Sequence, residues 1–86
     1  MKVVVLLFAA VFSTATFAKA DCKVNPKAEW MKEEDAKAKI LSQGYKIDIF
    51  KISGNCYEIY GSDKDGKKVE IYYDTKTLDV VKSEVK

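Results

Sequence analysis

The sequence predicts one small α+β domain, in which an N-terminal helix packs on a three- to four-stranded antiparallel meander sheet. Three patterns in the 86 residues lead to this fold class. The first 20 residues form a separate apolar segment, one helical pattern follows, and the rest alternates short β-rich runs with turn residues. Links this short join antiparallel neighbours. We therefore expect residues 21–86 to form a single domain.

The apolar first segment has the three parts of a secretory signal peptide. Met1–Lys2 supplies a positive start, Val3–Phe12 is an unbroken apolar run, and Ala18 and Ala20 are small residues at the two positions that a signal peptidase reads before a cleavage site at Asp21. A membrane anchor is the alternative, but a span needs about 20 apolar residues and hydroxyl side chains interrupt this run after Phe12. We expect residues 1–20 to be removed and the mature protein to be periplasmic, without a membrane span.

Charge and composition exclude several function classes for the remaining chain. After the first segment, Lys and acidic residues are equal in number, and the whole sequence lacks Arg and His. Nucleic-acid binding requires a basic surface, commonly with Arg. Most arrangements for acid–base or nucleophilic catalysis require His. We therefore expect no enzyme activity, no nucleic-acid partner and no cofactor.

Cys22 and Cys56 are predicted to form a structural disulfide. A small exported domain buries little apolar surface and commonly depends on a covalent cross-link. The sequence offers no C-x-x-C pair for redox exchange, and it has neither the His nor the further Cys that a zinc site requires. Closing a loop of this length contributes roughly 3 to 4 kcal/mol in a chain-entropy estimate.

One helix is expected from about Lys32 to Gln43. Acidic residues at positions 33–35 complement the positive N-terminal end of a helix, and Gly44 is a suitable stop. An irregular lead-in from Asp21 to Glu29 precedes it. The apolar stripe that should face the sheet consists of Ala36, Ile40 and Leu41, extended by Trp30 and Met31.

The strand pattern begins directly after the helix. Runs rich in Ile, Val and Tyr are separated by short groups of Gly, Asn, Asp, Ser, Lys and Thr. The four expected strands are Tyr45–Ile52, Cys56–Ser62, Lys67–Asp74 and Leu78–Lys82.

The register of the second hairpin follows from side-chain parity. Ile59 must share a face with Val69 and Ile71, which only an odd-length loop allows. A three-residue loop over residues 64–66 pairs Ile59 with Ile71 and places Gly66 at the left-handed position that such loops prefer. Tyr57 then lies opposite Tyr73, on the face where we expect the helix. The opposite face carries Glu58, Tyr60, Glu70 and Tyr72.

Two acidic groups deserve a test as chemical sites. Asp63–Gly66 resembles part of a calcium loop, but Gly61 and Tyr72 stand where the first and twelfth carboxylate ligands are needed. Glu58 and Glu70 share a sheet face, yet no His or metal accompanies them for acid–base work. We expect a turn and a polar sheet face, with no metal site and no catalytic residue.

The aromatic residues are the candidate binding site. Tyr60 and Tyr72 should lie on the face away from the helix, and Phe50 joins them if a bulge changes the side that the first strand exposes. Exposed aromatics beside an open sheet edge suit the capture of an extended peptide. The alternative is ordinary packing, because strands favour Tyr on a half-exposed face whatever the function.

Several runs in order resemble the PepSY family of small exported bacterial domains, over nearly all of residues 22–82. The resemblance depends on W-M-K-E-E-D-A-K-A-K-I-L from Trp30, then Gln43–Lys46, Asn55–Tyr60 and Asp63–Glu70. It implies a non-catalytic domain of the kind found in propeptides of thermolysin-type metalloproteases, where restraint of peptidases is proposed. No catalytic residue is carried over.

Two features depart from the family pattern, the helix N-cap and the turn before the last strand. Lys32 stands where relatives commonly have Ser or Thr as the helix N-cap, a change that costs about 1 kcal/mol. Thr75 and Leu78 replace the Pro and Gly of the usual D-P-x-T-G turn before the last strand.

Two functions from different classes follow. The first is an exported protein-binding module, monomeric or weakly dimeric, that holds a peptidase or another envelope protein. The alternative is a small-ligand carrier or an accessory subunit of a membrane redox protein, with a pocket between helix and sheet near Trp30. Haem is disfavoured because the chain lacks His.

Overall fold

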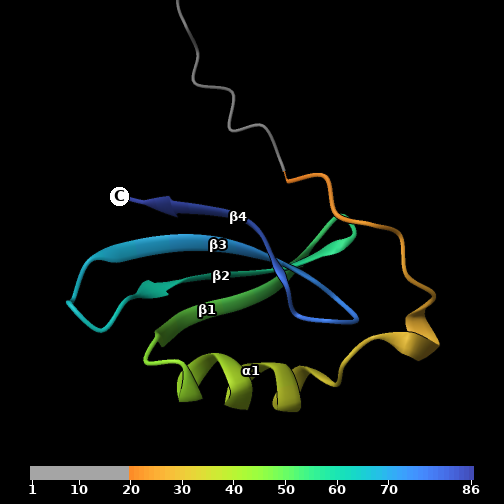
Figure 1. The fold of residues 1–86 in the computed structure, drawn as a ribbon, viewed down its shortest axis with the longest axis horizontal. Coiled ribbons are helices and arrows are strands. Elements are labelled where there is room, and N and C mark those ends of the chain that lie inside the picture. The colour runs from red at the N-terminus through yellow and green to blue at the C-terminus, as the bar shows by residue number, and fades with distance from the viewer. Residues whose placement is uncertain (1–19) are drawn as a thin grey trace, which may run out of the picture.

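The four strands form one antiparallel sheet in the order β1-β2-β3-β4. The structure is a computed structural model that describes residues 20–86, so nearly all of the predicted signal peptide lies outside the described residues. Two edges of the sheet result, β1 on the side of the helix and β4 on the far side (Figure 1). The elements in chain order are η1 (Lys27–Glu29), α1 (Glu33–Ser42), β1 (Lys46–Ser53), β2 (Cys56–Ser62), β3 (Lys68–Asp74) and β4 (Val80–Val85).

The predicted register of the β2–β3 hairpin is confirmed. Tyr57 lies opposite Tyr73 and Ile59 opposite Ile71. Asp63 donates and accepts hydrogen bonds at the base of the three-residue loop. Its N–H donates to the Lys67 carbonyl over 2.9 Å. Gly66 has φ +82°, the left-handed conformation that this loop requires. The hydrophobic parity of the two strands was therefore sufficient to determine their pairing.

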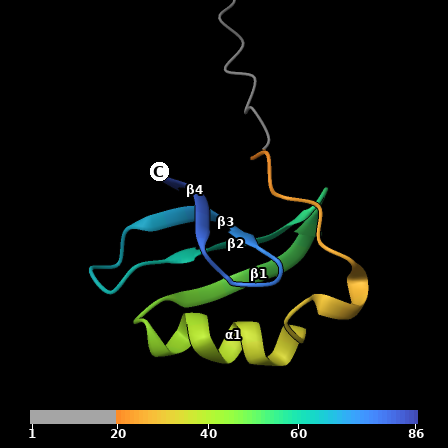
Figure 2. The same ribbon diagram turned by 45° about the vertical axis from the view of Figure 1, so that its right-hand side comes forward.

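The prediction of an N-terminal helix packed on the sheet is wrong. The first regular element is η1, and α1 follows a lead-in of twelve residues, 21–32. The backbone of α1 approaches β1 alone among the strands, so the helix covers only the β1 side of one sheet face (Figure 2). Only Ala36 and Ile40 of the helix are buried, whereas Leu41 is 52% exposed. A stripe of two positions, one turn apart, is too narrow to cover four strands.

The ends of α1 show what the sequence lacks and what it supplies. The N-cap residue Lys32 makes no side-chain hydrogen bond, as the missing Ser or Thr implies. Glu33 in the first turn forms an ion pair with Lys37 at 3.2 Å. Gly44 follows the helix with φ +94°, a conformation that ends the helix at little cost for Gly.

The prediction for the last strand was two residues early at its start and three at its end. Instead of Leu78–Lys82, β4 spans Val80–Val85. Leu78 still belongs to the turn, because its N–H donates to the Asp74 carbonyl over 2.9 Å and its φ is +63°. A buried Leu thus occupies the left-handed conformation, which Gly adopts most readily.

The two faces of the sheet pack differently. The helix face, defined here by Tyr57, Ile59, Val69, Ile71 and Tyr73, joins Ala36, Ile40 and Leu78 in one hydrophobic core. The outer face carries a smaller cluster of Cys22, Cys56 and Tyr72. The predicted disulfide between Cys22 and Cys56 is present and ties the lead-in to the first residue of β2.

Candidate functional site

A bulge in β1 decides which face Phe50 occupies. Pairing with β2 shifts by one residue between Ile47 and Ile49, so Ile49 lies opposite Tyr60 on the outer face. Phe50 lies opposite Ile59 and packs against the core of the helix face. The bulge therefore has the opposite effect to the predicted one, because it returns Phe50 to the helix face and exposes Ile49. The structure brings Tyr60 and Tyr72 to one face and leaves Phe50 on the other.

Gly61 accompanies this bulge on the neighbouring strand. A Cβ atom at position 61 would collide with the carbonyl group of Lys46. Only Gly permits this close approach of the two backbones.

Tyr72 and Tyr60 are engaged within the molecule. Tyr72 is 5% exposed and packs against the disulfide, whereas Tyr60 is half-buried with Lys51 Nζ 5.2 Å from its ring centre. Burial, followed by a hydrogen bond to Glu58, raises the pKa of Tyr72 to about 12. A hydrogen bond to Glu70, with burial and Glu58, raises the pKa of Tyr60. The outer face therefore offers little free aromatic surface.

Glu58 and Glu70 are buried beneath these side chains, with 1% and 4% exposure. Glu58 Oε1 lies 3.7 Å from Lys51 Nζ, and Glu70 Oε1 lies 3.9 Å from Lys86 Nζ. Each carboxylate thus pairs with one lysine, and within the described part of the chain Glu58 Oε2 has no hydrogen-bond partner. Among residues 20–86, no group of three or more His, Cys, Asp or Glu is placed to hold a metal ion.

Apolar surface is instead exposed around Tyr57, at the end of β1. The Trp30 ring meets the Tyr57 ring edge-on with centroids 5.5 Å apart, and the Phe50 ring lies 5.0 Å from it. Ile52 lies opposite Tyr57 in the sheet and is 49% exposed. We call Trp30, Phe50 and Ile52 the aromatic patch, with the buried Tyr57 as its floor.

Cations border the aromatic patch. Lys27 Nζ lies 4.7 Å from the Trp30 ring centre, and Lys37 Nζ lies 5.3 Å from that of Phe50. Such contacts are attractive, and Lys37 Nζ also pairs with Glu33 Oε1 at 3.2 Å. The patch therefore offers Lys27 to an apolar segment that carries an acidic residue.

The β1 backbone adds hydrogen-bonding groups beside the patch. Ser53 and Cys56 close a two-residue hairpin, so Ser53 and Lys51 bond to β2. The N–H and C=O groups of Phe50 and Ile52, which alternate with them, point away from β2. An extended segment added at this edge would bond to the two residues whose side chains form the patch.

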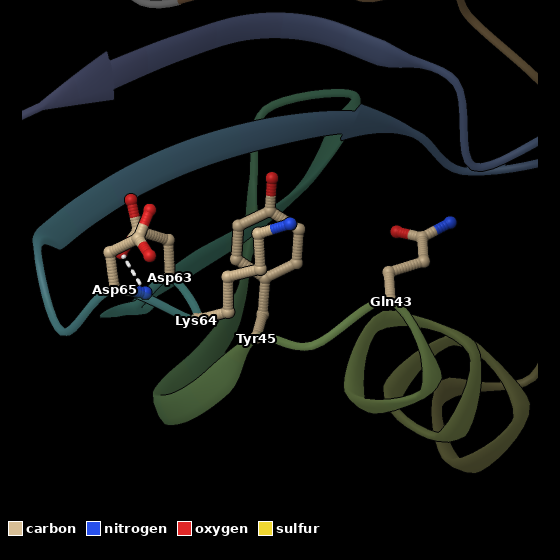
Figure 3. Close-up of a pocket in the computed structure, with 5 residues that line it drawn as sticks. All are labelled: Gln43, Tyr45, Asp63, Lys64 and Asp65. Atoms are coloured by element: carbon tan, nitrogen blue, oxygen red, sulfur yellow. Dashed lines mark hydrogen bonds between the residues drawn. The ribbon is translucent and has the colours of Figure 1, made fainter.

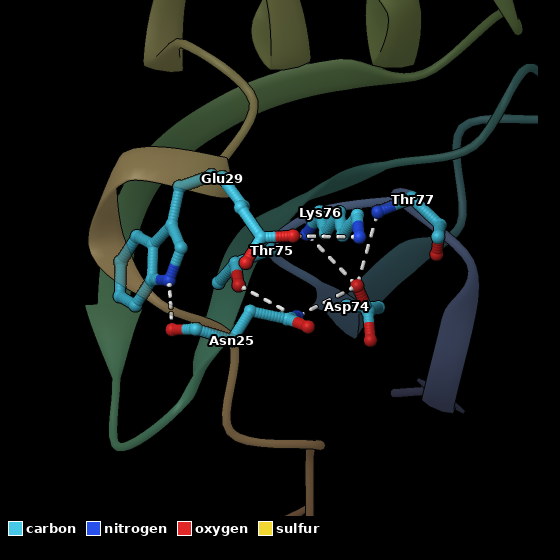
Figure 4. A network of polar contacts seen from close by, with 7 residues as sticks. Asn25, Glu29, Asp74, Thr75, Lys76 and Thr77 are labelled. Carbon is cyan, nitrogen blue, oxygen red and sulfur yellow. Dashed lines mark hydrogen bonds and ion pairs between the residues drawn. The ribbon is translucent and has the colours of Figure 1, made fainter.

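A polar network holds the lead-in in position and so places Trp30 (Figure 4). Asp74 Oδ1 accepts from Asn25 Nδ2 at 3.0 Å and from the N–H groups of Lys76 and Thr77 at 2.8 and 3.0 Å. The Trp30 indole N–H donates to the Asn25 carbonyl over 2.8 Å. The hydrogen bonds from the N–H groups of Thr77 and Lys76 lower the pKa of the Asp74 carboxyl group.

The sequence does not predict this network, because its partners lie about 50 positions apart. The signal available was Asp74 at the start of a turn, where Asp commonly accepts backbone N–H bonds. Nothing in the sequence identified Asn25 as its partner. Lys76 Nζ extends the network to Glu29 Oε1 at 2.8 Å.

The predicted ligand pocket near Trp30 finds no counterpart in two hollows of the described surface. One, of about 270 Å³, lies between the end of α1 and the β2–β3 turn (Figure 3), and Asp63 Oδ1 there accepts the N–H of Asp65. Its lining residues are Gln43, Tyr45, Asp63, Lys64 and Asp65. The other, an open hollow of about 450 Å³, is lined by Lys32, Glu33, Glu34 and Lys37.

A family model described as "Peptidase propeptide and YPEB domain" matches residues 2–84 of the chain. The chain matches no curated protein and no solved structure. Within the part of the chain that the structure describes, no helix is long and apolar enough to cross a membrane.

Proposed function

The chain belongs to the PepSY_2 family of peptidase propeptide and YPEB domains, and we propose that it binds and restrains an exported peptidase. PepSY domains are often associated with peptidase regulation and are in general propeptide-like or inhibitor-like modules. To restrain a peptidase, such a module needs a surface that binds the enzyme without being cleaved by it. The aromatic patch beside the β1 edge is that surface.

The observation that carries the proposal is the combination of free backbone groups and apolar side chains at one place. Phe50 and Ile52 each contribute both, since their backbone groups point away from β2 and their side chains adjoin Tyr57. Main-chain hydrogen bonds supply affinity in strand addition, and side-chain contacts supply specificity. Lys27 favours an acidic side chain of the peptidase at the rim.

The outer face is the alternative surface for binding the peptidase, because Tyr60 remains half-exposed there beside Ile49. Phe50 belongs to the first surface and the two tyrosines to the second, so variants on opposite faces of β1 separate them.

The place of action in this proposal is the periplasm. Removal of residues 1–20 leaves an N-terminus close to Cys22, whose disulfide requires an oxidising compartment. Expression of the full chain in bacteria, followed by intact-mass measurement of the periplasmic protein, should give a chain that begins at Asp21. Recovery of the uncleaved chain in the membrane fraction would contradict this part.

The binding test compares two isoleucines of the same strand. The full chain is expressed and its periplasmic form is added to the peptidase fraction of the source cell envelope, with hydrolysis of a fluorogenic peptide as the readout. Ile52→Lys changes the aromatic patch, and Ile49→Lys is its matched control on the outer face, with 49% and 53% exposure respectively. We expect the wild type to slow hydrolysis, Ile52→Lys to bind about tenfold more weakly, and Ile49→Lys to act like wild type.

Two results would contradict the proposal in different ways. Hydrolysis that is unchanged by the wild-type protein at every concentration argues against restraint of these peptidases. Inhibition that is lost in Ile49→Lys and kept in Ile52→Lys transfers the contact to the Tyr60 face.

A further inference from the structure

The backbone of β4 leaves one row of hydrogen-bonding groups unused by β3. Lys86 donates its N–H to the Lys68 carbonyl over 2.8 Å, and Glu84 lies opposite Glu70. Hydrogen-bonded pairs alternate along an antiparallel ladder, so Lys82 and Glu84 bond to β3. The N–H and C=O groups of Ser83 and Val85, and of Val81 beside the bulge, therefore point away from the sheet.

The side chains of this edge form an alternating pattern. Lys82 and Glu84 stand on the outer face, where their charged groups are 3.2 Å apart and about 30% exposed. Val81 and Val85 are 42% and 63% exposed. In each direction from Ser83, a charged residue comes first and a valine second. Lys82 on one side corresponds to Glu84 on the other, so the two charges are opposite in sign.

We propose that β4 pairs with β4 of a second copy of this chain, antiparallel and centred on Ser83, to form a continuous eight-stranded sheet. Ser83 of each copy exchanges both backbone hydrogen bonds with its counterpart. Val81 of one copy then lies opposite Val85 of the other, and Lys82 lies opposite Glu84. The two copies are related by a two-fold axis, which is the commonest symmetry of homodimers.

Charge complementarity selects this register over its neighbours. A pair centred on Lys82 or on Glu84 also satisfies the backbone alternation, but it sets like charges directly opposite each other. The pair centred on Ser83 sets two unlike pairs opposite each other and extends the Lys82–Glu84 ion pair of each copy into a four-charge cluster. This self-complementarity favours a second copy over an unrelated peptide.

The contact is weak and reversible. One strand pair buries less surface than the ~1,600 Å² of a standard stable interface. The dimer leaves both β1 edges at the far ends of the joined sheet. It is therefore independent of peptidase binding and compatible with it.

A charge-exchange experiment on the full chain, recovered from the periplasm, tests the pairing and its register. Lys82→Glu places Glu opposite Glu84 twice, and Glu84→Lys places Lys opposite Lys82 twice. Sedimentation velocity across a concentration series should show a wild-type dimer and at least tenfold weaker self-association for each single variant. The double variant K82E/E84K restores unlike pairs without changing net charge, and it should dimerise as the wild type does.

Mixing the two single variants gives the sharpest result. An equimolar mixture should form heterodimers, detected by native mass spectrometry with one variant labelled with ¹⁵N. Lys64→Glu and Asp65→Lys, which make the same charge changes on the exposed β2–β3 turn, form the control mixture. That mixture should dimerise as the wild type does and show no preference for heterodimers.

Ser83→Pro is a second test that does not depend on charge. Pro removes an N–H that the monomer leaves unused, so the variant should keep its fold by Trp30 fluorescence and lose the dimer. A wild type that stays monomeric at millimolar concentration overturns the proposal. A dimer that persists in Lys82→Glu or in folded Ser83→Pro also overturns it.

Discussion

The two edges of the sheet share a backbone geometry and differ in what their side chains can recognise. At β1, the free backbone groups of Phe50 and Ile52 lie beside exposed aromatic and aliphatic surface with a cationic rim. At β4, the free groups of Ser83 and its neighbours lie beside alternating charges and valines. An open edge supplies affinity for any extended chain, and the flanking side chains decide which chain it accepts.

The difference follows from what supports each edge. The lead-in and α1 add Trp30, Lys27 and Lys37 to the β1 side, so residues of three segments form the aromatic patch and its border. β4 is attached through the Asp74 turn and presents mainly its own residues. A surface assembled from several segments is specific for a different protein, whereas a single self-complementary strand is specific for its own copy.

Tyr57→Ala should break the β1 side of this comparison with the largest effect. Its ring is the floor of the patch and its hydroxyl donates to the Met31 carbonyl over 2.6 Å. Loss of a buried aromatic ring lowers the free energy of unfolding by about 3–5 kcal/mol. Urea unfolding followed by Trp30 fluorescence measures this change, with Tyr57→Phe as the control that loses about 1 kcal/mol. A Tyr57→Ala variant as stable as Tyr57→Phe would mean that the ring supports neither Trp30 nor Phe50.

Removal of the disulfide should weaken the β1 patch more than the β4 edge. Cys22 anchors the lead-in that carries Trp30, and the bridge closes a loop with a sequence separation of 34. The Cys22→Ala/Cys56→Ala variant should lose about 3–4 kcal/mol of unfolding free energy and shift Trp30 emission to the red. Adding reductant to this variant should change nothing further. The same Trp30 spectrum in both proteins would show that the polar network holds the lead-in alone.

Asp74 tests how the lead-in is joined to the turn before β4. Asp74→Ala removes the acceptor of three hydrogen bonds and should cost about 2 kcal/mol at neutral pH. The folded-state pKa of Asp74 is lowered, so its stabilisation is present above the unfolded value of about 3.9 and is lost as pH falls through the folded value.

Asp74→Asn keeps an acceptor and lacks this titration. The stability difference between wild type and Asp74→Asn should therefore shrink below pH ~4, as measured by urea unfolding at successive pH values. A difference that stays constant down to pH 2 would exclude the charge of Asp74 as its cause.

Leu78 gives the smallest expected effect and concerns the β4 turn alone. Its left-handed backbone favours Gly, while its side chain is 6% exposed in the core. Leu78→Ala and Leu78→Gly both lose that side chain, but Gly removes the backbone strain. Leu78→Gly should therefore be about 1 kcal/mol more stable than Leu78→Ala by urea unfolding, the reverse of the usual order. The usual order at this position would indicate that the turn relaxes in the variants.

Local pattern and chain connectivity were sufficient for much of the fold. The parity of Ile59 and Ile71 determined the central hairpin, Gly44 ended the helix, and two cysteines paired. Each of these features depends on residues close in sequence or on a choice with few alternatives. The candidate site was not predicted in this way, because Phe50 was expected beside Tyr60 and Tyr72 on the outer face and lies on the helix face instead.

Tertiary structure alone decided where the helix lies and which residues surround Phe50. Whether Phe50 faces the helix depends on a one-residue shift in the pairing of β1 with β2. That shift depends on both strands and on the close backbone approach that Gly61 permits. The position of Trp30 depends on Asn25 and Asp74, 49 residues apart. The sequence by itself determined the elements and their pairing, because those follow from periodicity. The packing of α1 and the aromatic patch depend on contacts between distant segments, for which the pattern of any one segment holds no information.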